Sequence, residues 1–265
     1  MANAAIKSFS EKVIELAKAD AAILAVAAAG SAITSETDEF SDLDLVIVTR
    51  EAIAPDAEKM RAFVARFPGL IAAFTGEHVG ERRLLICLYD KPLLHVDFKF
   101  LTADELGERV ENPVILFERE NILSGAYTAS EARWPMPDLQ WLEDRFWVWV
   151  HYAALKLGRG EFYETGDLLS FVRGQVLGPL LALKYGKLPR GVRKLETFLN
   201  AEDSTALQAT FAPPEKQALA RATYEAIVLY RRLRSSLPVT GLMRRVAAEK
   251  AAMDYLAQVT GKTND

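Results

Sequence analysis

The chain changes character near residue 135, and this change limits the folds open to it. Before that point, short apolar segments alternate with polar residues in the manner of strands. The segment Pro-Met-Pro-Asp at 135–138 interrupts the pattern, and the segments beyond it are longer and have helical periodicity. We therefore expect an α+β protein, with a mixed-sheet domain at 1–134 and an all-helical domain at 135–265.

Each part has its own expected elements. Alternating or continuous apolar runs predict strands at 22–29, 43–49, 70–75, 82–89, 93–101 and 114–117. Apolar residues at helical spacing predict two helices in the first part, at 4–19 and 55–67. In the second part the same spacing predicts helices at 138–157, 161–185, 191–200, 214–235 and 239–259.

The charge balance limits the classes of partner. The 265 residues carry a net charge of −4, so the large basic excess of a nucleic-acid-coating protein is missing and a nucleic-acid partner is unlikely. Residues 1–134 contain 14 Lys and Arg against 22 Asp and Glu, a net charge of −8, and residues 135–265 carry +4. An acidic half suits metal ions, and a basic half suits phosphates.

The single cysteine and the first residues of the chain indicate in which cellular compartment the protein is expected. One cysteine, Cys87, excludes an internal disulfide framework, and its apolar surroundings predict a buried side chain. The first residues do not have the pattern of a signal peptide, and the apolar run at 21–29 is too short to span a bilayer. We expect a cytoplasmic protein without a membrane partner.

Two acidic residues open the second expected strand. Asp42 and Asp44 project from the same side of that strand, because neighbouring strand residues alternate between faces. Two adjacent carboxylates repel each other unless a divalent cation binds between them. An Asp-x-Asp pair alone is often only a cap or a surface feature, so the surrounding sequence decides its meaning.

A third carboxylate lies in a later apolar strand. His95, Asp97 and Lys99 share one face there, and Lys99 would offset the carboxylates or contact a phosphate. If the two strands are neighbours, Asp97 meets the Asp-x-Asp pair, and three carboxylates can hold two Mg²⁺ ions for displacement at phosphorus. Before them, Gly30 allows a phosphate to approach the backbone, and Ser31 offers it a hydroxyl and an N–H.

The order Gly-Ser, Asp-x-Asp and a later Asp resembles the nucleotidyltransferase superfamily of DNA polymerase beta. Size and the helical second half are most similar to the aminoglycoside and lincosamide nucleotidyltransferases. The resemblance in the core motif covers residues 20–100 and implies a nucleotidyltransferase domain at 1–134, with the helical domain at 135–265 completing the nucleotide and acceptor cleft. It implies transfer of a nucleoside monophosphate, usually AMP from ATP, to a hydroxyl group, with release of pyrophosphate.

The resemblance also implies roles for individual residues. Asp42 and Asp44 would bind two Mg²⁺ ions, and Gly30 and Ser31 would hold the β- and γ-phosphates. Asp97 would be the third carboxylate, either a metal ligand or the base for the acceptor hydroxyl. A further glycine that many family members carry in the next loop is missing, since residues 32–41 contain none.

A second segment, in the helical half, resembles an Arg-Gly-Glu stretch of several antibiotic nucleotidyltransferases. Lys156 and Arg159 at the end of an expected helix could reach phosphates of the nucleotide. Glu161 or Glu164, at the start of the next helix, would be the general base. A surface turn with solvated charges is the alternative interpretation.

We expect a Mg²⁺-dependent enzyme that uses ATP or another NTP and acts on a small-molecule hydroxyl acceptor, such as an aminoglycoside- or lincosamide-like antibiotic. Two alternatives stay open: a nucleotidyltransferase that modifies protein or RNA, and a catalytically retired nucleotide-binding module. Homodimer formation also stays open.

Overall fold

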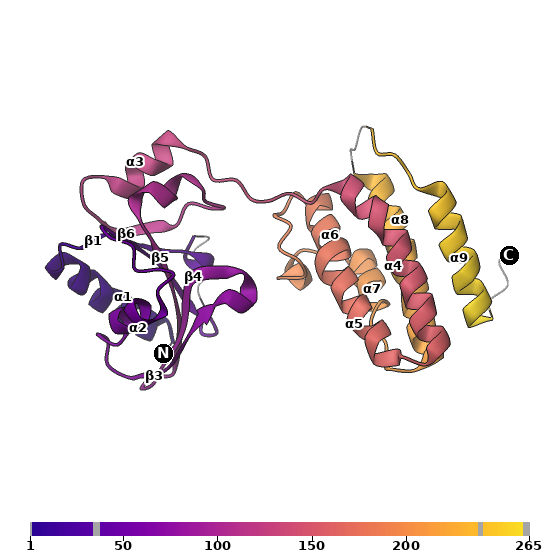
Figure 1. The fold of residues 1–265 in the computed structure, drawn as a ribbon, viewed down its shortest axis with the longest axis horizontal. Helices are drawn as coiled ribbons and strands as arrows, with labels where there is room; N and C mark the ends of the chain where they lie inside the picture. The colour runs from indigo at the N-terminus through magenta and orange to yellow at the C-terminus, as the bar shows by residue number, and fades with distance from the viewer. Residues whose placement is uncertain (1, 34–37, 238–240, 262–265) are drawn as a thin grey trace. The chain divides into compact units, whose positions relative to one another are not determined.

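The computed structural model describes residues 2–33, 38–237 and 241–261. The chain divides into two compact units, Met1–Pro135 and Met136–Asp265, which we call the sheet unit and the helical unit (Figure 1). In the described residues the first unit contains a mixed sheet with helices and the second unit is built of helices. The expected α+β class is confirmed.

The sheet unit is built on one sheet with the strand order β3-β4-β5-β2-β1-β6. The strands are β1 Ile23–Ala28, β2 Leu43–Thr49, β3 Leu70–Gly76, β4 Glu81–Tyr89, β5 Leu94–Leu101 and β6 Val114–Glu118. Strands β2 and β5 pair parallel, whereas the other neighbouring strands of this sheet pair antiparallel. Each expected strand is confirmed to within one residue at either end.

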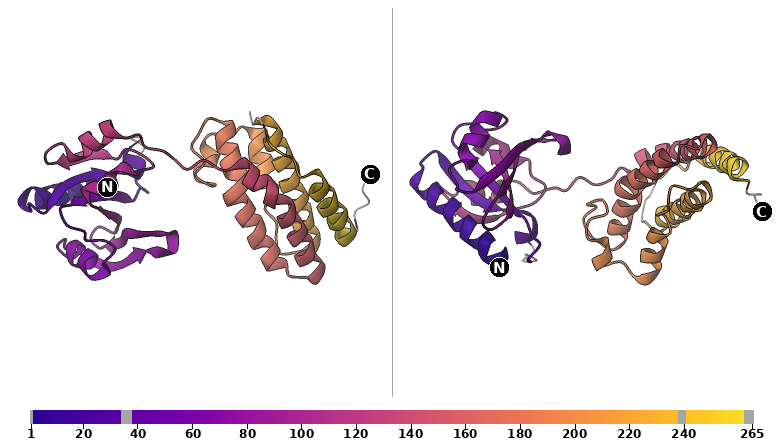
Figure 2. Two further views of the ribbon diagram at one scale, coloured as in Figure 1. Left: turned by 45° about the horizontal axis from the view of Figure 1, so that its top comes forward. Right: turned by 90° about the horizontal axis from the view of Figure 1, so that it is seen from below.

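Helices cover both faces of this sheet (Figures 1 and 2). On one face, α1 (Ala2–Ala19) and α2 (Ala57–Val64) bury apolar side chains against the phenylalanines of β5. On the other face, α3 (Ile122–Ala129) and a short 3₁₀ turn at Ala103–Gly107 pack against β1 and β2. The second core is smaller, and the site described below lies on its face of the sheet.

Two local features set the helix bounds of the sheet unit. The carboxylate of Asp56 accepts the N–H groups of Glu58 and Lys59, so α2 begins after this cap and not at Pro55. The helix ends at Val64, three residues before the expected end. Helix α3 was not expected, and it follows Asn121, which has a left-handed backbone.

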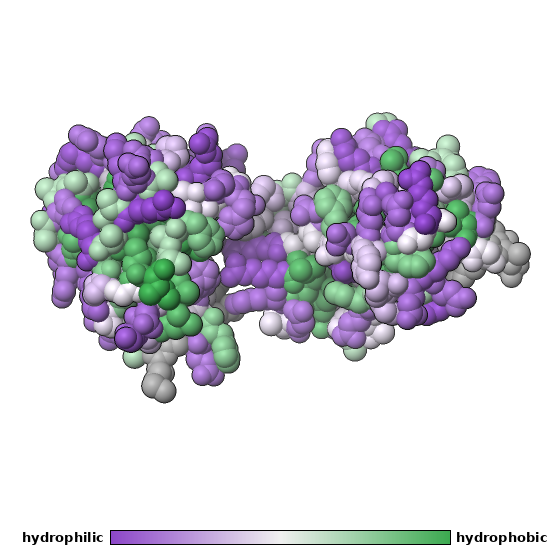
Figure 3. Space-filling view, turned by 60° about the horizontal axis from the view of Figure 1, so that its bottom comes forward, coloured by the Kyte–Doolittle hydropathy of each residue, from purple (hydrophilic) through white to green (hydrophobic). Residues whose placement is uncertain are grey.

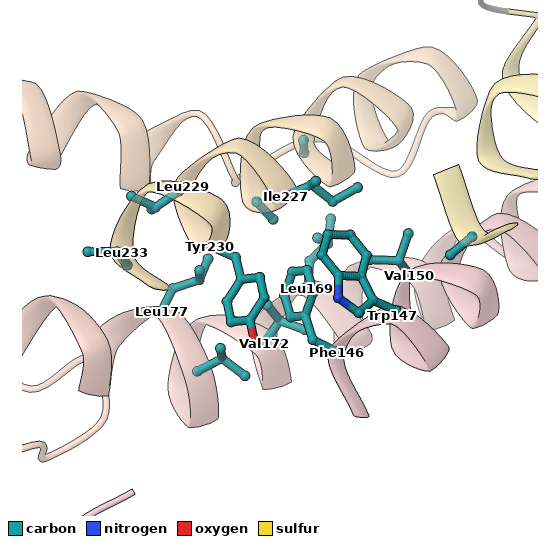
Figure 4. Close-up of a cluster of buried hydrophobic side chains, with 14 of the residues drawn as sticks. Phe146, Trp147, Val150, Leu169, Val172, Leu177, Ile227, Leu229, Tyr230 and Leu233 are labelled. Carbon is teal, nitrogen blue, oxygen red and sulfur yellow. The ribbon is translucent and has the colours of Figure 1, made fainter. Parts of the chain in front are cut away.

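The helical unit contains long helices that pack around one apolar core. Its elements are α4 Leu139–Arg159, α5 Phe162–Val172, a π-helical turn Arg173–Leu177, α6 Gly178–Lys184, a 3₁₀ turn Leu195–Thr197, α7 Ala201–Gln208, α8 Lys216–Ser236 and α9 Val246–Thr260. Phe146 of α4 stacks on Tyr230 of α8 with ring centroids 3.7 Å apart, and Trp147 is buried beside them (Figure 4). This aromatic contact ties the two longest helices together.

The expected helix at 191–200 is wrong. Gly191 and Lys194 both have positive φ, at 64° and 58°, so the chain turns there and forms only the short 3₁₀ segment. The expected helix at 161–185 is interrupted by the π-helical turn. The last helix begins at Val246 instead of 239, and residues 238–240 lie outside the described residues.

The face of each unit shown in Figure 3 is mostly hydrophilic, with separate hydrophobic areas. The outermost strand β3 exposes Ile71 and Phe74. Among the described residues, no helix has the length and apolar character needed to cross a bilayer.

Candidate active site

The parallel pair β2 and β5 brings two of the predicted carboxylates together. Asp44 and Asp97 are register partners on these adjacent strands. Their chain neighbours Leu45 and Phe98 are buried in the core under α1 and α2. Because strand residues alternate, both carboxylates lie on the opposite face of the sheet.

Asp97 has an environment that disfavours its charge. Its Oδ1 atom is buried and lies 2.9 Å from Nε2 of His95, but outside hydrogen-bond geometry, so it receives no hydrogen bond. Burial raises the pKa of Asp97, and the nearby carboxylate of Asp42 raises it further, while His95 lowers it in part. Asp42 is therefore close enough to act on Asp97 electrostatically, although it precedes β2.

Gly30 lies directly beside Asp44. It opens a 3₁₀ turn with φ of +60°, and a Cβ atom at this position would overlap the carboxylate of Asp44. The N–H of the preceding Ala29 donates to the main-chain oxygen of Asp44 at 2.9 Å. Only glycine combines this backbone with this contact. The Gly-Ser turn and the acidic strand, predicted separately from sequence, are thus neighbours, with Ser31 following in the same turn. Of the loop expected at 32–41, residues 34–37 lie outside the described residues.

The residues present suit a hard cation that completes its shell with substrate oxygens. In the described part of the chain, no group of three or more His, Cys, Asp or Glu side chains is arranged to hold a metal ion. Mg²⁺ is commonly bound through one or two carboxylates together with water and substrate phosphates. Two adjacent carboxylates, one with a buried oxygen that receives no hydrogen bond, are a fitting ligand set of this kind.

Lys99 is part of an ion-pair network on the same face of the sheet. Its ammonium group lies 2.7 Å from Glu81, which also pairs with Arg83 at 2.8 Å, and Arg83 reaches Glu105 at 3.1 Å. Hydrogen bonds from Arg83, and then from Lys99, lower the pKa of Glu81 to about 2 against the opposing effect of burial. The charge of Lys99 is therefore balanced within the sheet unit.

The second predicted cluster lies at the junction of α4 and α5 in the helical unit. The ammonium group of Lys156 lies 2.5 Å from Glu161 and 2.9 Å from Glu164, and these contacts raise its pKa. Arg159 lies 3.8 Å from Glu161 and is mostly exposed, and Tyr152 donates a hydrogen bond to Glu164. The structure brings Lys156, Arg159 and Glu161 together, as a cluster in which the cations already face carboxylates.

Comparison with known families decides the class of protein. The model of the streptomycin adenylyltransferase family matches residues 5–258, nearly the whole chain. The chain belongs to this family. It is therefore a nucleotidyltransferase, and the resemblance to antibiotic nucleotidyltransferases is confirmed. No curated protein matches the chain.

Two solved structures are similar to this family member. One is a crystal structure of an aminoglycoside 6-adenyltransferase from Bacillus subtilis, 15% identical with a TM-score of 0.44, covering 93% of this chain and 95% of that chain. The other is a nucleotidyltransferase-like protein from Exiguobacterium sibiricum, 16% identical with a TM-score of 0.36, covering 95% of this chain and 78% of that chain.

Sequence reasoning missed several charged residues around the site of this adenylyltransferase family member. Glu81, Arg83 and Glu105 were not singled out, because two of the ion pairs that connect this network, Lys99–Glu81 and Arg83–Glu105, join residues that are not sequence neighbours. The one available signal was the run of three charged residues at 81–83 that opens β4, which antiparallel pairing with β5 brings near Lys99.

Proposed function

We propose that this chain transfers the AMP group of ATP to a hydroxyl group of an aminoglycoside of the streptomycin class and releases pyrophosphate. Membership of the streptomycin adenylyltransferase family supports this class of acceptor. The observation that carries the chemistry is the in-register pair Asp44 and Asp97, with Gly30 packed against Asp44.

Asp42, Asp44 and Asp97 would hold Mg²⁺, and two ions is the number that we propose. Bound there, Mg²⁺ would neutralise charge on the phosphates and help to align the reacting oxygen with the α-phosphorus. The hard carboxylate oxygens and the buried Oδ1 of Asp97 support this assignment.

The remaining steps use groups of this chain. Gly30 and Ser31 would hold the β- and γ-phosphates, because the missing side chain at Gly30 leaves backbone open beside Asp44. The acceptor oxygen forms a bond to the α-phosphorus as the bond to the bridging oxygen breaks, and pyrophosphate carries away that electron pair. The hydroxyl proton passes to a carboxylate, for which Asp97 and Glu161 are our two candidates.

Mass spectrometry of the product tests the proposal directly. The protein is incubated with Mg²⁺, each of the four common NTPs in turn, and streptomycin, other aminoglycosides or a lincosamide. We expect a product heavier by one AMP group with ATP and streptomycin, together with pyrophosphate. Unmodified acceptors throughout, with folded protein and fresh nucleotide, would overturn the proposal.

A matched pair of variants decides between the two candidate bases. Glu161 and Glu164 both pair with Lys156, so Glu161→Gln and Glu164→Gln each remove one carboxylate charge from the same cluster. If Glu161 is the base, only Glu161→Gln lowers turnover, by on the order of 100-fold. Small effects of both variants exclude the two glutamates as the base and leave Asp97 as the candidate.

A further inference from the structure

A cavity of about 270 Å³ opens in the sheet unit on the same face as the carboxylates. Its apolar floor comes from β2, β5 and the 3₁₀ turn, and α3 contributes Tyr127. We call it the Tyr127 pocket, defined by Val46, Lys99, Leu101, Leu106, Arg109 and Tyr127.

The Tyr127 pocket begins next to the reacting groups. Val46 and Lys99 follow Asp44 and Asp97 by two residues on the same strands, and two strand residues span about 7 Å. Ala29, the residue before the Gly-Ser turn, also lines the pocket. The pocket therefore lies about two strand residues along the sheet from the carboxylates.

One wall of the pocket offers both hydrogen-bond donors and acceptors at fixed positions. Lys99, Glu81, Arg83 and Glu105 form the ion-pair network described above, and all four line the pocket. Each carboxylate in such a network keeps lone pairs, and each cation keeps N–H groups, that can bind hydroxyl groups. This wall is suited to a polyhydroxylated ring.

Another part of the lining, formed by Arg109 and Tyr127, is also held in place. Arg109 donates to the Leu106 carbonyl at 3.2 Å and to Ser130 Oγ at 2.7 Å, and its guanidinium group lies 4.8 Å from the centroid of the Tyr127 ring. The hydroxyl of Tyr127 donates to the carbonyl of Pro113 at 2.9 Å. The aromatic ring is thus fixed in the wall, where it can contact the C–H groups of a sugar-like ring.

The charges disfavour a triphosphate in this pocket. Four glutamates line it, Glu81, Glu105, Glu108 and Glu111, against three cations. Lys99 and Arg83 already pair with two of these glutamates. An anionic phosphate chain would meet repulsion, whereas a hydroxylated, positively charged molecule would not.

We propose that the Tyr127 pocket is the acceptor subsite and selects polyhydroxylated, cationic molecules such as aminoglycosides. This proposal rests on the proposed function, because the acceptor hydroxyl must reach the α-phosphate beside Asp44 and Asp97. Glu81 and Glu105 receive hydrogen bonds from hydroxyl groups of the acceptor, and Glu108 and Glu111 in the lining attract its positive charge.

Two valines of similar exposure provide a matched pair for the test. Val110 is 45% exposed and lines the pocket, and Val114 is 43% exposed, four residues along, and lies outside its lining. Val110→Trp narrows the pocket, so we expect the KM for streptomycin to rise about tenfold, equivalent to 1.4 kcal/mol, with the KM for ATP within twofold. Val114→Trp should change neither value.

A charge reversal tests the electrostatic part. Glu108 lines the pocket and Glu131 is an exposed glutamate of the same unit outside it. Glu108→Lys should raise the KM for streptomycin severalfold, and Glu131→Lys should leave it unchanged. A rise in the KM for ATP instead would make the pocket a nucleotide site and overturn the proposal.

Calorimetry separates this proposal from the proposed function. Streptomycin is titrated into wild-type protein, Val110→Trp and Val114→Trp without nucleotide. Binding that is weakened only by Val110→Trp supports the pocket even if no AMP transfer occurs. Equal binding by all three proteins, or no binding by wild type, overturns it, whatever the turnover with ATP.

Discussion

Asp97 of the sheet unit and Glu143 of the helical unit are both largely buried carboxyl groups, but their surroundings differ. Both oxygens of Glu143 are within hydrogen-bond distance of Arg234, at 2.9 and 3.0 Å, and Tyr230 donates to it at 2.6 Å. The Oδ1 atom of Asp97 is buried without a hydrogen bond, although His95 lies 2.9 Å away.

The pKa values move in opposite directions as a result. Burial alone would raise both, but the hydrogen bonds from Tyr230, the Arg245 N–H and Arg234 lower the pKa of Glu143 below its usual value. Burial raises the pKa of Asp97. A satisfied buried carboxylate holds a fold together, whereas an unsatisfied one is kept at the expense of stability, as functional sites often are. The comparison thus contrasts a carboxylate with a satisfied, structural environment and one for which we propose a functional role.

The largest expected effect is on stability, in the helical unit. Removing Glu143 leaves Arg234 buried beside Tyr230 without this partner, so Glu143→Ala should lower the free energy of unfolding by about 3–5 kcal/mol. Chemical denaturation followed by circular dichroism measures it. A loss below 1 kcal/mol would contradict the structural role given to this carboxylate.

The next effect is on catalysis, in the sheet unit. Asp44→Asn removes one charge that would hold Mg²⁺, so we expect turnover to fall by on the order of 100- to 1000-fold. The unfolding free energy should stay within about 1 kcal/mol of wild type, as is usual for a substitution that keeps the size of the side chain. Asp90→Asn, in an exposed turn, is the control and should keep full turnover.

A smaller effect of opposite sign is expected at Asp97. Asp97→Asn replaces a charge that burial disfavours by a neutral group, so in metal-free buffer at pH 7 the protein should gain about 1 kcal/mol of stability. The same exchange at Glu143, Glu143→Gln, should destabilise it. If both variants shift the unfolding midpoint in the same direction, the contrast between the two carboxylates fails.

The smallest effect concerns pH. The pKa of Glu143 is lower in the folded protein than the value of about 4.3 for an unfolded chain. The charged carboxylate therefore contributes its full stability at pH values above the pKa of Glu143 in the unfolded chain. This contribution is lost as the pH falls through the pKa of Glu143 in the folded protein. The stability difference between wild type and Glu143→Gln should shrink between pH 6 and pH 3, as measured by urea titrations.

The strands of the sheet unit could be predicted because each has an apolar pattern of its own. The alternation of apolar and polar residues around Asp44 and Asp97 also indicated that each side chain projects from the face of its strand opposite the apolar core. What sequence could not supply is which side chains of two neighbouring strands meet, and hence the pairing of Lys99 with Glu81. Likewise, the helix expected at 191–200 failed because Lys194, a good helix former, has a left-handed backbone that local helix propensity does not predict.

The candidate site was predictable in its residue types but not in its electrostatics. Spacing indicated that Lys156 and Arg159 lie near Glu161, but nothing in it indicates that Lys156 is held between two carboxylates. In the same way, the motif placed Gly30 before Asp44 without showing that their atoms are in contact. Such contacts depend on side-chain positions that local sequence patterns do not encode.

Backbone hydrogen bonds between β2 and β5 set the spacing of Asp44 and Asp97. The segment at 50–93, which connects the two strands, is therefore not needed to hold the two carboxylates at this spacing. This segment includes the exposed turn at 90–93, between β4 and β5. In a circularly permuted protein, the chain would begin and end in that turn, and a linker would join the original N- and C-terminal residues. We expect this protein still to bring the two carboxylates side by side. The motif can therefore be reordered along the chain while its geometry is preserved.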